Sequence, residues 1–185
     1  MMPEISLNIL DVAENCVKAK ASLVELTVRA DSGQNTLTVI IKDNGCGMSK
    51  EQVEAVTDPF FTTRTTRKVG LGVPFFKMAA ESSGGSFGIE SELGVGTVVT
   101  AVFMLDSIDR MPLGDMVSTM HMLITMNEHM DFVYNYSVDG REFTLDTRQF
   151  REVLGDVSFA EPEVSAYIRD FLKENTAEVT ENVQL

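Results

Sequence analysis

Basic residues and cysteines are scarce in this 185-residue sequence, and long apolar runs are missing. Its 15 Lys and Arg residues are outnumbered by 28 Asp and Glu residues, giving a net charge of −13. This charge argues against a general nucleic-acid surface, because phosphates attract clustered positive side chains. Two cysteines, Cys16 and Cys46, make no disulfide framework and fit a reducing cytoplasm. With no apolar run near 18 residues and no basic signal-peptide start, we expect a cytoplasmic protein without membrane or nucleic-acid partners.

The spacing of apolar residues predicts an α+β fold. Residues 5–20 follow the helical period, and residues 23–28 and 37–41 are typical of strands. A short helix, a polar segment, a second helix and two further strands follow, the strands at 86–90 and 97–104. This order predicts a two-layer α/β sandwich, in which helices cover one face of a mixed β-sheet.

The last 80 residues are expected to form an appendage. We expect a first domain over 1–105, a linker over 106–114, a small α+β module over 115–175 and a frayed tail over 176–185. The module begins with a methionine-rich helix, continues as a β-hairpin that turns at Asp139-Gly140, and ends in an amphipathic helix. About 60 residues are few for an independent core, so the module should pack on the first domain or on a partner.

A polar, glycine-containing turn follows the strand over 37–41. Asp43 stands at the carboxyl end of this strand, and a carboxylate accepts hydrogen bonds without donating any, which suits an exocyclic amino group. Gly45 and Gly47 would let the backbone bend and approach a flat ligand closely. On its own, this segment predicts no more than a turn.

Two polar side chains share a face of the first helix. Asp11 and Asn15 are four residues apart, so they lie on neighbouring turns and can offer a carboxylate and an amide to one ligand. A solvated helix face is the alternative interpretation of the same pattern.

A basic segment and a pair of glycines precede the second long helix. A cluster of positive charge is unusual in so acidic a chain, and this one consists of Arg64, Arg67 and Lys68. Such a cationic segment could fold over phosphates. Gly70 and Gly72 precede an apolar helical run, and a helix N-terminus is a natural phosphate site. Neither a Walker A loop nor a G-x-G-x-x-G motif is present.

Five segments over residues 5–105 resemble, in their order, the motifs of the Bergerat-fold ATPases. This GHKL superfamily contains gyrase, heat-shock chaperone, histidine kinase and mismatch-repair ATPases. Residues 11–15 resemble the N box, and residues 58–63 resemble the phenylalanine box of the histidine-kinase branch. Residues 43–48, 68–73 and 94–97 resemble the three glycine boxes.

The resemblance implies ATP and Mg²⁺ as cofactors. It implies that Asp11 orients or deprotonates the attacking water, that Asn15 binds Mg²⁺, and that Thr97 holds the adenine together with Asp43. Asp11 stands where Glu is usual, and its shorter reach should weaken hydrolysis. The implied nucleotide-binding residues are Asn15, Asp43, Gly45, Gly47, Met48, Phe60, Thr62, Thr63, Arg64, Arg67, Lys68, Gly70, Leu71, Gly72, Val73 and Thr97.

The sequence favours an ATP/Mg²⁺-binding regulatory protein of the histidine-kinase-like ATPase type. We expect a nucleotide-dependent switch with an unidentified partner protein, whose ATP hydrolysis, if present, is slow; a homodimer is left open. The alternatives are a serine kinase acting on a partner, similar to the anti-sigma-factor branch, and a non-catalytic interaction module that retains the fold. Whether the chain is an ATPase or a protein kinase is left open. His121 and His129 follow the ATPase motifs in surroundings unlike a histidine-kinase phosphoacceptor.

Overall fold

Alternating apolar residues give the β-sheet one buried face. In the computed structural model, which describes residues 4–57, 71–181, 183 and 185, Leu37, Val39 and Ile41 are at most 1% exposed. The helices are α1 (Ile5–Lys18), α2 (Lys50–Thr57), α3 (Gly72–Ser82), α4 (Met116–Met126), α5 (Thr147–Leu154) and α6 (Pro162–Thr180). The strands are β1 (Leu23–Asp31), β2 (Thr36–Asp43), β3 (Ser86–Glu92), β4 (Gly96–Met104), β5 (Asp131–Val138) and β6 (Arg141–Asp146).

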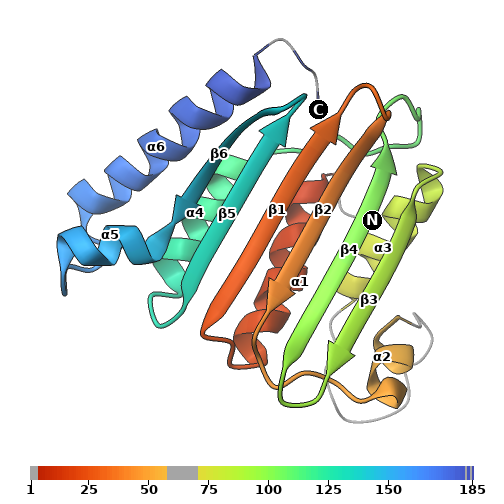
Figure 1. Cartoon of the computed structure of the whole chain (residues 1–185), viewed down its shortest axis with the longest axis horizontal. Coiled ribbons are helices and arrows are strands. Elements are labelled where there is room, and N and C mark those ends of the chain that lie inside the picture. The colour runs from red at the N-terminus through yellow and green to blue at the C-terminus, as the bar shows by residue number, and fades with distance from the viewer. Residues whose placement is uncertain (1–3, 58–70, 182, 184) are drawn as a thin grey trace.

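These strands form one mixed sheet in the order β3-β4-β2-β1-β5-β6. β5 runs parallel to β1, whereas every other pair of neighbours is antiparallel. Helices α1, α3 and α4 lie behind the sheet in Figure 1, and α6 packs against α4, β5 and β6. The expected α+β fold, with a mixed sheet covered on one face by helices, is confirmed.

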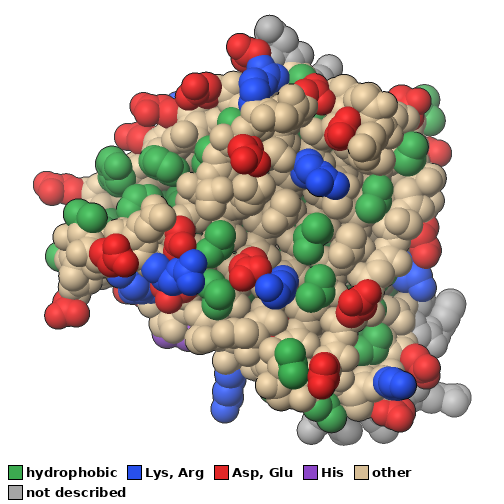
Figure 2. Space-filling view, in the orientation of Figure 1, with side chains coloured by type: hydrophobic (Ala, Val, Ile, Leu, Met, Phe, Trp, Pro, Cys, Tyr) green, Lys and Arg blue, Asp and Glu red, His purple; other side chains and the backbone are tan. Residues whose placement is uncertain are grey.

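Within the described residues, helices α1, α3 and α4 leave the other face of the sheet uncovered, and Figure 2 views the molecule from that side. Acidic, basic and hydrophobic side chains are interspersed on it. Lys42 and Glu25, on neighbouring strands, form an ion pair of 3.0 Å. None of the helices in the described part of the chain is both long and apolar enough to cross a membrane.

The C-terminal residues extend the same sheet. β5 pairs with β1 from Leu23 opposite Asp131 to Ala30 opposite Val138. Residues 131–146 therefore continue the sheet of the N-terminal part, whereas the prediction from sequence was a small module packed on the first domain or on a partner. The alternation of apolar residues along β5 indicates a buried face but does not indicate which strand lies beside it.

The C-terminal helix extends beyond residue 175, after which a frayed tail was expected. Val179 is only 5% exposed, and the Tyr136 and Thr180 hydroxyls are 3.0 Å apart and hydrogen-bonded. These contacts hold the last turn of α6 against β5, so residues 176–180 are helical. The methionine-rich helix α4 likewise contributes to the core through Met116 and Met120.

Candidate nucleotide-binding site

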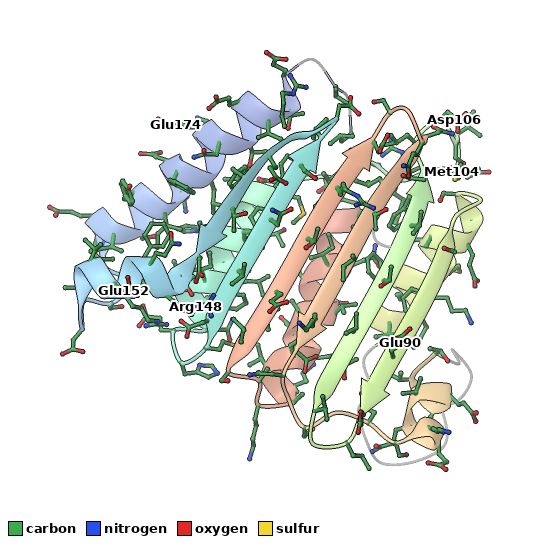
Figure 3. All side chains as sticks on the ribbon, in the orientation of Figure 1. Glu90, Met104, Asp106, Arg148, Glu152 and Glu174 are labelled. Carbon is green, nitrogen blue, oxygen red and sulfur yellow. The ribbon has the colours of Figure 1, made fainter. Side chains whose placement is uncertain are left out.

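Three polar side chains form a row across β2, β4 and β3, at one end of the helix-covered face. The sheet register places Asp43 opposite Thr97, and Thr97 opposite Ser91. The next row of the same face is apolar: Ile41, Val99 and Ile89. Glu90, labelled in Figure 3, precedes Ser91 and marks this end of β3. On this face, the hydrophobic core therefore ends at the apolar row. Two residues beyond that row on each strand, the side chains can form hydrogen bonds with a ligand.

Asp43 is 8% exposed, and its carboxylate has neighbours on the following loop and on α1. Its Oδ1 accepts a hydrogen bond of 2.7 Å from the backbone N–H of Gly45. The Cys16 thiol of α1 is a neighbour of this carboxylate: its pKa is raised by burial and further by the negative charge of Asp43. Asn15 directly precedes Cys16 on α1. The segment that carries Asn15 therefore lies next to Asp43, although the two residues were predicted from separate motifs.

The loop after Asp43 is tied to structure on both of its sides. The side-chain oxygen of Asn44 accepts hydrogen bonds from the backbone N–H groups of Ser22 and Leu23, at 2.9 and 3.0 Å. Gly94 donates to the Cys46 carbonyl at 2.8 Å, and Met48 donates to the Ser91 hydroxyl at the same distance. The loop is therefore preorganised by the β1 entrance and by the β3–β4 hairpin.

Gly45 and Gly47 are required by the packing of this loop. A Cβ at Gly47 would lie 1.9 Å from the carbonyl oxygen of Glu92, and the residue has a left-handed φ of +66°. A Cβ at Gly45 would lie 2.7 Å from that of Ala19. The structure thus gives these glycines a structural role, in addition to the ligand approach that the sequence analysis expected of them.

Asp11 lies against the first residue of α3. A Cβ at Gly72 would come within 2.7 Å of the Asp11 Cβ and 3.3 Å of its Oδ2. Burial, followed by the charge of Glu14, raises the pKa of the Asp11 carboxyl, although Lys18 opposes the shift. The two chain neighbours of Gly72, which were also predicted to bind the nucleotide, differ in exposure. Leu71 is 47% exposed, whereas Val73 is 3% exposed and belongs to the core.

Replacing Asp11 with Asn is expected to raise the melting temperature at pH 7. The raised pKa means that the ionised carboxylate is less favourable in the folded chain than in the unfolded chain, and this cost is present once pH exceeds the folded-state value. Below the ordinary value of 3.8, Asp11 is protonated in both states and the variant should gain nothing. Thermal melts at pH 7 and pH 3 test this, with Asp109→Asn as an exposed control. Equal melting temperatures of Asp11→Asn and the wild type at pH 7 would contradict the prediction.

Some of the predicted site residues lie together in the structure, and others fall outside the part that it describes. It brings Asp43, Gly45, Gly47, Met48 and Thr97 together, and it places Asp11 beside Gly72. Asn15 is half-buried on α1, one turn beyond Asp11. The predicted residues that lie outside the described part of the chain are Phe60, Thr62, Thr63, Arg64, Arg67, Lys68 and Gly70.

Ser91 is not among the site residues predicted from the sequence. Its hydroxyl forms hydrogen bonds with Met48, Gly96 and Thr97. Ser91 therefore links the loop after β2 to the start of β4, beside Thr97. The available signal was the strand period: Phe87, Ile89 and Ser91 alternate, which places Ser91 on the core face, where a polar residue needs a partner.

The chain matches a known protein family. A family model described as histidine kinase-, DNA gyrase B- and HSP90-like ATPase matches residues 4–107, which is more than half of the chain. The chain therefore belongs to this family, and the resemblance of its motifs to the GHKL ATPases is confirmed.

Individual relatives match about half of the chain. Sensor protein SrrB of Staphylococcus aureus is 33% identical over an alignment of 101 residues, and the alignment covers 52% of this chain and 17% of SrrB. The chain spans less than a fifth of the length of the curated relatives it matches.

Two solved structures are similar to this one. The N-terminal domain of a DNA repair protein superposes with a TM-score of 0.54 at 11% identity, over 96% of this chain and 57% of that one, and shares the fold. The Aquifex aeolicus MutL ATPase domain complexed with ADP gives a TM-score of 0.48 at 17% identity, over 83% of this chain and 70% of that one.

Proposed function

We propose that this protein binds ATP with Mg²⁺ and acts as a nucleotide-dependent regulatory switch of the histidine-kinase-like type. The row of Asp43 and Thr97, beside a glycine loop tethered at both sides, supports the proposal most directly. Asp43 accepts hydrogen bonds only, so it would bind the 6-amino group of adenine. Two free thiols, Cys16 and Cys46, favour the cytoplasm as the place of this activity.

Mg²⁺ would be held jointly by the nucleotide and by Asn15. Mg²⁺ in nucleotide sites usually keeps several waters and binds one or two protein groups plus phosphate oxygens. Within residues 4–57 and 71–181, no three His, Cys, Asp or Glu residues gather as a metal cage. The Asn15 amide oxygen, one helical turn from Asp11, suits a single protein ligand of this kind.

Asp11 would act on the terminal phosphate. Asp11, on α1, lies against Gly72 at the start of α3, where backbone N–H groups and the positive helix end favour phosphate oxygens. The predicted basic segment, with Arg64, Arg67 and Lys68, would add cations to the triphosphate. Because Asp reaches less far than Glu, we expect slow hydrolysis, and transfer of the phosphate to a partner protein is the alternative.

Replacing Asn15 with Ala should weaken binding of Mg-ATP about tenfold or more while changing the affinity for metal-free ATP little, because a metal ligand is removed and no base contact is. Calorimetric titration with ATP, with and without Mg²⁺, measures both affinities. Asn8, on the same helix, is buried and therefore unsuitable as a control. Asn127→Ala, at the C-terminal end of α4, is the control. Equal losses with and without metal would refute the metal role.

The reaction class is decided by phosphate release on the same sample. Phosphate release from Mg-ATP that is lost in Asp11→Asn supports the ATPase. Tight binding without release supports a switch or a kinase that awaits its substrate protein. A protein that binds neither ATP nor ADP would instead be an interaction module that retains the fold.

A further inference from the structure

The Ser91 hydroxyl is the meeting point of three polar groups. Its oxygen lies 2.8 Å from the backbone N–H nitrogen of Met48, 2.9 Å from the Gly96 carbonyl oxygen and 2.8 Å from the Thr97 hydroxyl oxygen. The three groups come from the loop after β2 and from the start of β4. Ser91 is half-buried, so these contacts are partly shielded from water.

The protons in this cluster can be assigned by counting. A serine hydroxyl has one hydrogen to donate and two lone pairs that accept. The Met48 N–H can only donate and the Gly96 carbonyl can only accept, so they use one lone pair and the single hydrogen of Ser91. The second lone pair of Ser91 faces Thr97, and the short O···O contact there requires a hydrogen. That hydrogen must belong to Thr97.

This assignment fixes what Thr97 offers to a ligand. Its hydrogen is committed to Ser91, so only its lone pairs remain for other partners. Asp43, directly opposite Thr97 in the sheet, also presents only acceptors, and one of its oxygens already binds Gly45. The two side chains therefore form an edge that accepts hydrogen bonds and donates none.

Resting on the nucleotide site proposed above, we propose that Ser91 is a positioning residue that sets base specificity through Thr97. With Thr97 held as an acceptor, the edge favours a purine that carries a 6-amino donor and disfavours one that carries a 6-oxo acceptor. A 6-oxo group, placed where the 6-amino group of adenine would lie, meets lone pairs and donates no hydrogen there. The neighbouring N1–H of such a purine can satisfy only one of the two acceptors, so lone pairs still face each other at position 6, which is costly in a partly shielded site. Without Ser91, the Thr97 hydroxyl is free to rotate and donate to the oxo group.

The test compares ATP with inosine triphosphate, which carries the 6-oxo group. Calorimetric titrations with Mg²⁺ give both affinities for the wild type, Ser91→Ala and Ser91→Thr. The wild type should prefer ATP, and Ser91→Ala should narrow this preference roughly tenfold, the equivalent of about one hydrogen bond. Ser91→Thr keeps the hydroxyl and should restore most of the preference.

Thr97→Val shows whether Ser91 acts through Thr97. In the Thr97→Val background, Ser91→Ala should leave the ratio of the two affinities unchanged, because no hydroxyl remains to be oriented. Ser86→Ala, on the same strand but exposed and far from the row, is the matched control and should not alter the ratio. If Ser91→Ala does not fold, Ser91→Cys keeps the side-chain volume with a weaker donor and should show a smaller narrowing.

The outcomes separate this role from the proposed function. If Ser91→Ala lowers the affinity for both nucleotides by the same factor, Ser91 only holds the loop and the specificity role is overturned. If the ratio still changes in the Thr97→Val background, Ser91 does not act through Thr97. A wild-type protein that binds neither nucleotide overturns the proposed ATP site itself.

Discussion

Replacing Asp43 with Asn is expected to lower ATP affinity about 100-fold while leaving the fold intact. The substitution exchanges one carboxylate oxygen for an NH₂ group, which removes a charged acceptor and places a donor where the adenine amino group would donate. The remaining oxygen can still accept from Gly45, so the loop keeps its bond. Calorimetry measures the affinity, and circular dichroism monitors the fold.

Asp106→Asn is the matched control for this experiment. Asp106 follows β4, at the opposite end of that strand from Thr97 (Figure 3), and it accepts a hydrogen bond from Asn35 at 2.6 Å. It is therefore expected to retain wild-type ATP affinity. An Asp43→Asn protein that binds ATP as well as this control does would remove the basis for the nucleotide site.

Replacing Gly47 with Ala should reduce ATP affinity at least tenfold and lower the melting temperature. The added Cβ would collide with the Glu92 carbonyl, and the left-handed φ of +66° costs a non-glycine residue roughly 1–2 kcal/mol. The loop must then move away from the β3–β4 hairpin, which breaks the contact between Met48 and Ser91. Thermal melts and ATP titrations measure the two effects.

Gly88→Ala separates a general cost of losing glycine from this collision. Gly88 lies on β3, and a Cβ there would meet nothing within 4 Å. This variant should keep its ATP affinity and its stability. Two variants with equal affinity would show that the loop geometry at Gly47 does not matter to the site.

Much of the fold could be predicted from local patterns. Apolar residues at helical spacing in α1 and at alternate positions in β2 each indicate a buried face, and the structure buries those faces. The ordered motifs also predicted that Asp43 and Thr97 would lie close together, although they are far apart in the sequence; the register of β2 and β4 pairs them. A family pattern contains this register implicitly, because the motifs recur in the same order around the same sheet.

Other features depend on contacts that no local pattern contains. Ser91 becomes important only when β3 and β4 pair, since the partners of its hydroxyl come from two different segments. The end of α6 depends on Val179 and on the bond from Tyr136, which comes from a strand more than 40 residues earlier. The pairing of β5 with β1 has the same origin: an alternating strand specifies a face, and the partner strand is chosen by the assembly of the whole sheet.

The parallel pairing of β1 with β5 also affects how the chain folds during its synthesis. β1 and β2 can form a hairpin as soon as both have left the ribosome, but the partner on the other edge of β1 arrives about 100 residues later. Contacts of such high sequence separation slow folding, and an unpaired strand edge invites association with other chains in the interval. The nascent ATPase motifs are therefore complete before the sheet that supports them, and chaperone capture during translation is expected to act on the exposed edge of β1.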